Sequence, residues 1–190
     1  MTVTKLSRCL IFFVSCIAYA QLPVDFGIKG GFSLTDAYGH CCNTQPSATY
    51  SNAKDYLVGP FVELHLIKGF SVEADGLFRP VNLVSSATLT NAFSVSRFTT
   101  WEFPVLAKVR LGRFPVIKPL IEAGPSFRVH VNRAPNLTAD GFTAGAGVEF
   151  KLPVIHLSSD LRYTRWTSPG SAASTSPNVN QVELLFGISF

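Results

Sequence analysis

Beyond Gln21 the chain repeats one pattern eight times: apolar and polar side chains alternate at every second position. In an extended strand, neighbouring side chains point to opposite faces, so each segment has one apolar face and one polar face. The eight segments are 24–34, 56–66, 70–80, 101–111, 119–129, 142–150, 155–166 and 180–190. Each has about the 9–11 residues that a tilted strand needs to cross a bilayer. No run of 18 apolar residues follows Gln21, so the sequence predicts no spanning helix.

The connections between these segments alternate in length. Residues 35–55, 81–96, 130–141 and 167–179 form long connections, and residues 67–69, 112–118 and 151–153 form shorter ones. Transmembrane β-barrels of bacteria have an even number of strands, short periplasmic turns and longer external loops. We therefore predict an all-β fold, an eight-stranded antiparallel transmembrane β-barrel with an up-and-down meander. Both termini would lie in the periplasm.

The charged side chains of these segments share the face that would line the barrel lumen. Only 15% of the residues are charged, against about 25% in ordinary soluble domains, so a lipid-facing surface is favoured. An eight-stranded barrel is just wide enough for side chains to fill, and buried charges require partners. We predict a lumen ion-pair network of Glu63, Glu73, Asp75, Arg79, Glu102, Lys108, Glu122, Arg128, Glu149, Asp160 and Arg162, joined by Lys29 and Arg110 on the same face. Acidic and basic side chains are nearly equal in number on this face, and we interpret the network that they form as a structural plug of the lumen.

Aromatic and proline residues add two further expectations. Trp101, Tyr163 and Trp166 lie near the ends of segments that would meet the outer interface, where amphipathic rings are favoured, and we predict that they form an aromatic girdle. Four prolines fall inside the predicted strands, at positions 60, 80, 104 and 125. Proline cannot donate to a sheet ladder, so we expect bulges or strand ends at these positions.

The first twenty residues are typical of a signal peptide. Lys5 and Arg8 precede an apolar run over residues 9–20, and the small residues Ala18 and Ala20 indicate cleavage between Ala20 and Gln21. The predicted domains are thus a signal peptide, 1–20, and a barrel domain, 21–190. An uncleaved N-terminal membrane anchor is the alternative.

Removing this leader changes the charge and cysteine inventory. The chain has 16 basic and 12 acidic residues, and two of the basic residues lie in the leader. The mature chain would therefore have 14 basic and 12 acidic residues. Without a block of like charges, we expect no nucleic-acid partner. Cys41 and Cys42 are the cysteines that remain. In an oxidising compartment they would form a vicinal disulfide or an intermolecular one, and their spacing favours no metal site.

Several motifs resemble the small outer-membrane β-barrel family of bacteria, the OmpA-like and PorT-like barrel domains. They are WEFPVLAK at 101–108, EAGPSFR at 122–128, VGPFVEL at 58–64 and LRY at 161–163. The chain also ends on an aromatic residue, Phe190. The resemblance implies a location in the cell outer membrane and contact with outer-membrane lipid. It also implies that Phe190 is an assembly signal, read by the barrel-assembly machinery.

For function, we expect a monomeric, non-enzymatic barrel without a cofactor, either structural or presenting its long connections to an extracellular ligand. Two other functions stay open: a narrow pore for small solutes, and a lipid-modifying enzyme that uses Ser126 and His130. His65 and His156 would lie near the inner rim as ordinary polar residues. A soluble, lipocalin-like barrel, with the apolar face turned inward, is the architectural rival.

Overall fold

The computed structural model describes residues 23–35, 49–52, 56–87, 92–112, 116–130, 139–152, 155–167 and 178–190. Its strands are β1 (Val24–Ser33), β2 (Thr49–Asn52), β3 (Tyr56–Ile67), β4 (Phe70–Asp75), β5 (Leu77–Ala87), β6 (Ala92–Arg110), β7 (Ile117–His130), β8 (Asp140–Lys151), β9 (His156–Trp166) and β10 (Asn180–Ser189). Within these ranges no helix has the length and hydropathy of a membrane span. The predicted cleavage site at Ala20 and Gln21 and the pair Cys41–Cys42 lie outside the described residues.

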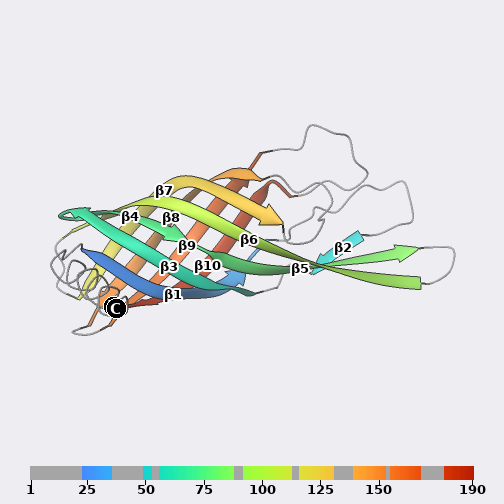
Figure 1. Cartoon of the computed structure of the whole chain (residues 1–190), viewed down its shortest axis with the longest axis horizontal. Coiled ribbons are helices and arrows are strands. Elements are labelled where there is room, and N and C mark those ends of the chain that lie inside the picture. Colours follow the sequence, from blue (N-terminus) through green and yellow to red (C-terminus); the bar gives the residue numbers. More distant parts are fainter. Residues whose placement is uncertain are drawn as a thin grey trace, which may run out of the picture.

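Most of the strands close into one antiparallel barrel (Figure 1). From β1 the order is β10, β9, β8, β7, β6, β4 and β3, and β3 pairs with β1 again to complete the circle. β4 and β5 act as a single barrel strand, because Phe61 pairs with Asp75 and Val58 with Phe78 in one unchanged register. The barrel therefore has eight strands, which confirms the predicted fold class.

The prolines interrupt the ladder without shifting it. Gly76, which separates β4 from β5, lies opposite Pro60 and donates its N–H to the Pro60 carbonyl at 2.9 Å. Between β6 and β7 the pairs Pro104–Ser126 and Ala107–Ala123 belong to one register. The bulges and strand ends expected at these prolines are thus absent in the described strands. A proline removes only its own N–H, and the neighbouring pairs keep the register. The shift that does occur lies between β3 and β4, at His65 to Ile67.

Two predicted loops contain strands. β5 and β6 continue through the expected connection 81–96 and stay paired as far as Ala87 and Ala92. β7 pairs with β6 only from Thr100 onward, so residues 92–99 of β6 belong to a ribbon that projects from the barrel, at the end opposite the C-terminus (Figure 1). β2, inside the expected connection 35–55, pairs with the outer part of β5. We call β2 with residues 80–87 and 92–99 the ribbon.

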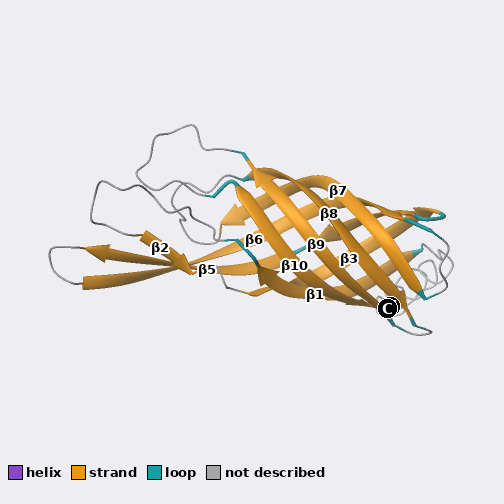
Figure 2. Ribbon diagram, turned by 180° about the vertical axis from the view of Figure 1, so that it is seen from behind, coloured by secondary structure: helices purple, strands orange, loops and turns teal. Residues whose placement is uncertain are grey.

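The two faces of the strands separate as predicted. Large apolar side chains point away from the lumen on every barrel strand whose side chains are described, for example Ile28, Val58, Ile121, Leu161 and Phe186. Charged side chains on the alternate positions are buried inside. Figure 2 shows the tilted strands side by side around this interior. The outward apolar face rules out the inverted, lipocalin-like arrangement.

Candidate functional site

The buried charges of the lumen gather in three tiers along the barrel axis. The outer tier, toward the ribbon, contains Arg79, Glu102, Arg128, Trp166, Gln181 and Glu183. The middle tier contains Lys29, Glu73, Asp75, Lys108, Glu122, Asp160 and Arg162. The inner tier, at the end that holds the C-terminus, contains Asp25, Glu63, His65, Arg110, Glu149 and His156. Alternation places every one of these side chains on the inward face of its strand.

Arg162 is the centre of the middle tier. From β9 its Nη2 lies 2.7 Å from Glu73 Oε1 and its Nε lies 2.5 Å from Glu122 Oε1. Its Nη1 donates to Asp75 Oδ2. The side chain is 1% exposed. One guanidinium thus joins β4, β7 and β9 across the whole lumen, and its planar fork of five donors allows this.

Two lysines complete the middle tier. Lys29 Nζ lies 2.5 Å from Glu73 Oε1 and 3.3 Å from Asp160 Oδ2. The same ammonium stands 4.7 Å from the centroid of the Phe61 ring, a cation–π contact. Lys108 Nζ lies 2.6 Å from Glu73 Oε2 and 3.6 Å from Glu122 Oε2. Glu73 is therefore shared by three cations.

The outer tier is built around Glu102. Arg128 Nη2 lies 2.9 Å and Arg79 Nη1 3.3 Å from its Oε1. Gln181 Nε2 donates to the other oxygen at 3.1 Å. Glu183 lies 3.6 Å from Arg79 Nη1. Two arginines and two glutamates balance here.

Trp166 belongs to this tier and corrects the predicted girdle. It is 4% exposed, its Nε1 donates to Gln181 Oε1 at 2.8 Å, and the Arg128 guanidinium stacks 3.7 Å from its ring centroid. Strand parity explains the correction, because Trp166 shares its face with Arg162 and Thr164. Trp101 and Tyr163 do face outward, where Trp101 packs edge-on against Phe78 and the Tyr163 hydroxyl donates to Asn180 at 2.7 Å.

The inner tier adds histidines to the charge network. Arg110 contacts Glu63 Oε1 through Nη2 at 2.6 Å and Glu149 Oε2 through Nε at 2.6 Å. Asp25 Oδ2 lies between two rings, 2.9 Å from His65 Nε2 and 3.2 Å from His156 Nδ1. These histidines tie β3 and β9 to β1 near the end of the barrel.

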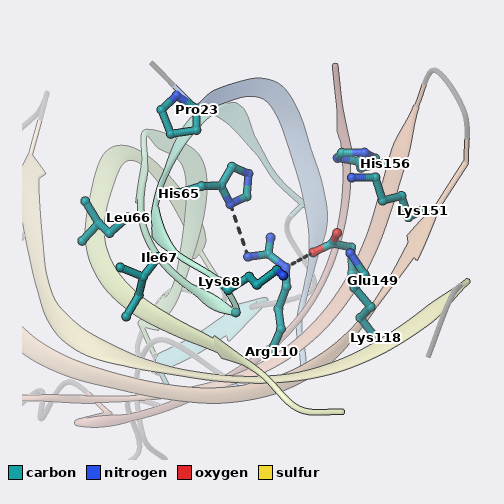
Figure 3. A pocket seen from close by; sticks show the side chains of 11 residues that line it. Pro23, His65, Leu66, Ile67, Lys68, Arg110, Lys118, Glu149, Lys151 and His156 are labelled. Carbon is teal, nitrogen blue, oxygen red and sulfur yellow. Dashed lines mark hydrogen bonds and ion pairs between the residues drawn. The ribbon is translucent and has the colours of Figure 1, made fainter. Parts of the chain in front are cut away.

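Among the described side chains, the cavities found between the tiers are small. One cavity of about 10 Å³ lies between the middle and inner tiers beside Ser158, and another of about 10 Å³ lies beside Leu77 and Thr143. Each is about as large as a single water requires. A much larger cavity of about 380 Å³ opens at the inner end, below Arg110 (Figure 3).

Two lumen carboxylates were missing from the predicted network. Asp25 and Glu183 both bind its cations or histidines, so nine carboxylates face six lysines and arginines in the three tiers. Strand parity alone could have identified both, because Glu183 follows Gln181 and Asp25 precedes Gly27 on the inward face. All eleven predicted network residues lie in the tiers.

The serine suggested for catalysis hydrogen-bonds to a neighbouring hydroxyl group in the lumen. Ser126 Oγ lies 2.5 Å from Thr143 Oγ1, which in turn lies 2.6 Å from Thr164 Oγ1. The side chain of His130 lies outside the described part of the chain. Phe190 is exposed and donates its backbone N–H to the Phe26 carbonyl at 3.0 Å, next to the barrel seam. Its role as an assembly signal stays a prediction.

A family model and one solved structure agree with this architecture. The family model of the outer membrane protein beta-barrel domain matches residues 7–190. The crystal structure of the outer membrane protein OprG from Pseudomonas aeruginosa superposes with a TM-score of 0.59 at 13% identity, over 87% of this chain and 95% of that one. The outer membrane channel DcaP of Acinetobacter baumannii gives a TM-score of 0.30 at 10% identity, over 86% and 62% of the two chains. No curated protein matches in sequence.

Proposed function

Because the chain belongs to the outer membrane protein β-barrel domain family, and so resides in the outer membrane, we propose that it is an occluded barrel that presents its ribbon as a binding surface. In this proposal the lumen neither conducts solutes nor catalyses a reaction. The barrel is a rigid support, and the ribbon extends away from the membrane on the extracellular side.

The observation that carries the proposal is the arrangement around Arg162. Its contacts with Glu73, Asp75 and Glu122 cross the lumen, and the tiers above and below leave cavities of only about 10 Å³ among their described side chains. Moving a solute past this point would require at least one buried ion pair to break. Leaving a buried charge without its partner costs about 3–5 kcal/mol.

The ribbon supports the second half of the proposal. At roughly 3.4 Å per residue, residues 92–99 extend β6 about 27 Å past its last pair with β7. A two-stranded hairpin alone is marginally stable, and β2 adds a third strand through the pairs from Thr49–Ser85 to Asn52–Asn82. Such a supported sheet edge offers backbone groups to a strand of a partner protein.

Planar-bilayer recording tests the occlusion. Purified wild-type protein is expected to add no conductance above leak. The double variant E122A/R162A, which removes a buried pair together, is the positive control and is expected to show discrete steps. Regular steps from the wild type, at the same protein density, would support the narrow pore instead.

Surface labelling tests the orientation of the ribbon. Cysteine is placed at Ser94 in a background in which Cys41 and Cys42 are serine. A membrane-impermeant maleimide is expected to label S94C on intact cells, whereas S71C, in the buried inner part of the lumen, stays unlabelled. Labelling of S94C only after lysis would place the ribbon in the periplasm and contradict extracellular presentation.

A further inference from the structure

We propose that the large cavity at the inner end of the barrel is a binding site for a phosphate group. The cavity has a volume of about 380 Å³, which falls in the usual range of ligand sites, roughly 300–1,000 Å³. Its walls come from β3, β6, β7, β8 and β9 (Figure 3). It lies at the opposite end of the molecule from the ribbon and shares no residue with the proposed binding surface; only its exposure to the periplasm rests on the orientation in the proposed function.

One lysine within or directly beside each short connection of the barrel lines this cavity. Lys68 comes from the turn between β3 and β4, Lys118 from the start of β7, and Lys151 from the end of β8. Figure 3 shows Lys118 and Lys151 with His156 on one side of the cavity, opposite Leu66 and Ile67. The lysines therefore converge on one opening although they are far apart in the sequence.

The charges of the lining are unbalanced in favour of an anion. Arg110 and Glu149 neutralise each other at 2.6 Å. Within the described residues, no carboxylate lies within 4.0 Å of Lys68, Lys118 or Lys151. By contrast, each lysine and arginine of the three tiers has a carboxylate within that distance. Asp25 and Glu63 lie behind the cavity and are bound by His65, His156 and Arg110. A ligand is thus held at the rim, among three ammonium groups.

The chemistry of the rim favours phosphate over a carboxylate or a metal cation. Three ammonium groups would repel a cation, and a single carboxylate would neutralise only one of them. A phosphate group presents several acceptor oxygens to separate point charges, which is how lysine ordinarily binds it. A free phosphate and the headgroup of a lipid share this chemistry.

The apolar wall makes both sources of the phosphate group physically accessible. Leu66 is 51% and Ile67 72% exposed, next to Lys68 and across the cavity from Lys118 and Lys151, at the inner edge of the lipid-facing surface. A phospholipid of the periplasmic leaflet could place its headgroup at the rim and its chains along this wall. A soluble phosphate would reach the same lysines from the periplasm.

The test uses the purified, folded barrel and two probes. In uncharged detergent, calorimetry with inorganic pyrophosphate is expected to show saturable binding that weakens with added salt. In lipid nanodiscs, native mass spectrometry is expected to show retention of phosphatidylglycerol over phosphatidylcholine. Pyrophosphate binding indicates a soluble ligand, and retention of the lipid alone indicates a headgroup; either supports the site.

Variants separate this site from general charge attraction. K118Q/K151Q is expected to weaken binding at least tenfold, about the loss that removing even one charge-assisted hydrogen bond produces, and K118R/K151R to restore most of it. R165Q removes an exposed positive charge from β9 near the ribbon end and is expected to leave binding unchanged. Equal weakening by R165Q, or no saturable binding of either probe by the wild type, would overturn the proposal.

Discussion

At the scale of single residues, Arg162 makes the sharpest prediction about stability. Replacing it with methionine keeps much of the volume but leaves Glu73, Asp75 and Glu122 without their shared partner. We expect R162M to lower the free energy of unfolding by about 3–5 kcal/mol, the usual result of breaking a buried ion pair. Urea unfolding in lipid vesicles, followed by the gel mobility of unheated samples, measures this change.

The matched control for Arg162 lies three residues along the same strand. Arg165 is exposed, so R165M is expected to change the free energy of unfolding by no more than about 0.5 kcal/mol. Equal stability of R162M and the wild type would mean that the middle tier is solvated and contributes nothing to the folded state.

The corrected position of Trp166 can be checked by fluorescence. The chain has two tryptophans, so W101F and W166F each leave one reporter. In vesicles of brominated lipid, Trp101 on the outward face is expected to be quenched strongly, and Trp166 in the lumen, against Arg128 and Gln181, only weakly. Strong quenching in the W101F protein would mean that Trp166 faces lipid and would contradict its position in the lumen.

At the scale of strands, the interruption beside Pro60 gives a paired prediction. A Cβ added to Gly59 would overlap the carbonyl oxygen of Gly76 on the neighbouring strand, whereas one added to Gly76 would meet nothing nearer than Phe103 at 3.6 Å. G59A must push the two strands apart, so it is expected to destabilise by about 1–3 kcal/mol or more. G76A is expected to fold like the wild type. The folded fraction after refolding compares the two, and equal yields would contradict the close approach.

The strands that meet lipid were predictable because the outward face of each is apolar and the inward face is polar or charged. A slip of one residue would turn charged side chains such as Glu122 and Lys108 toward lipid, so the alternation specifies the register strongly. The same rule assigns Trp166 inward. The girdle prediction was wrong for Trp166 alone of its three residues, because it relied on residue type and on position along the strand. The inner-tier contacts of Asp25 depend on a β1–β3 closure that no local pattern encodes.

The ribbon escaped prediction for a different physical reason. Residues 80–87 and 92–99 extend past the barrel, so no lipid-facing surface requires a continuous apolar stripe there. Without that stripe, a sequence such as Ser94-Val95-Ser96 looks like loop. There β5 and β6 pair with each other, and β5 also pairs with β2, which comes from the expected connection 35–55 far upstream.

At the scale of the whole molecule, the barrel and the ribbon are expected to be separable. All barrel pairs lie in residues that remain when 82–97 is replaced by Asn-Gly, a dipeptide suited to a tight hairpin turn. The shortened protein is expected to keep its heat-modifiable gel mobility and a free energy of unfolding within about 1 kcal/mol of the wild type. A refolding failure of this variant, with the full-length chain folding beside it, would show that the ribbon helps the barrel to close.

The three tiers have a consequence for the order in which the chain must assemble. Asp75 arrives with β4 and Glu122 with β7, but the Arg162 guanidinium that contacts both arrives only with β9. Lys29, from β1, can meet Glu73 of β4 early, but its second partner, Asp160, is also on β9. An unfinished sheet would therefore carry unmatched charges on the concave side while its convex side already seeks lipid. We therefore expect insertion strand by strand to be unfavourable, and transfer into the bilayer to be completed only when β9 and β10 have been added.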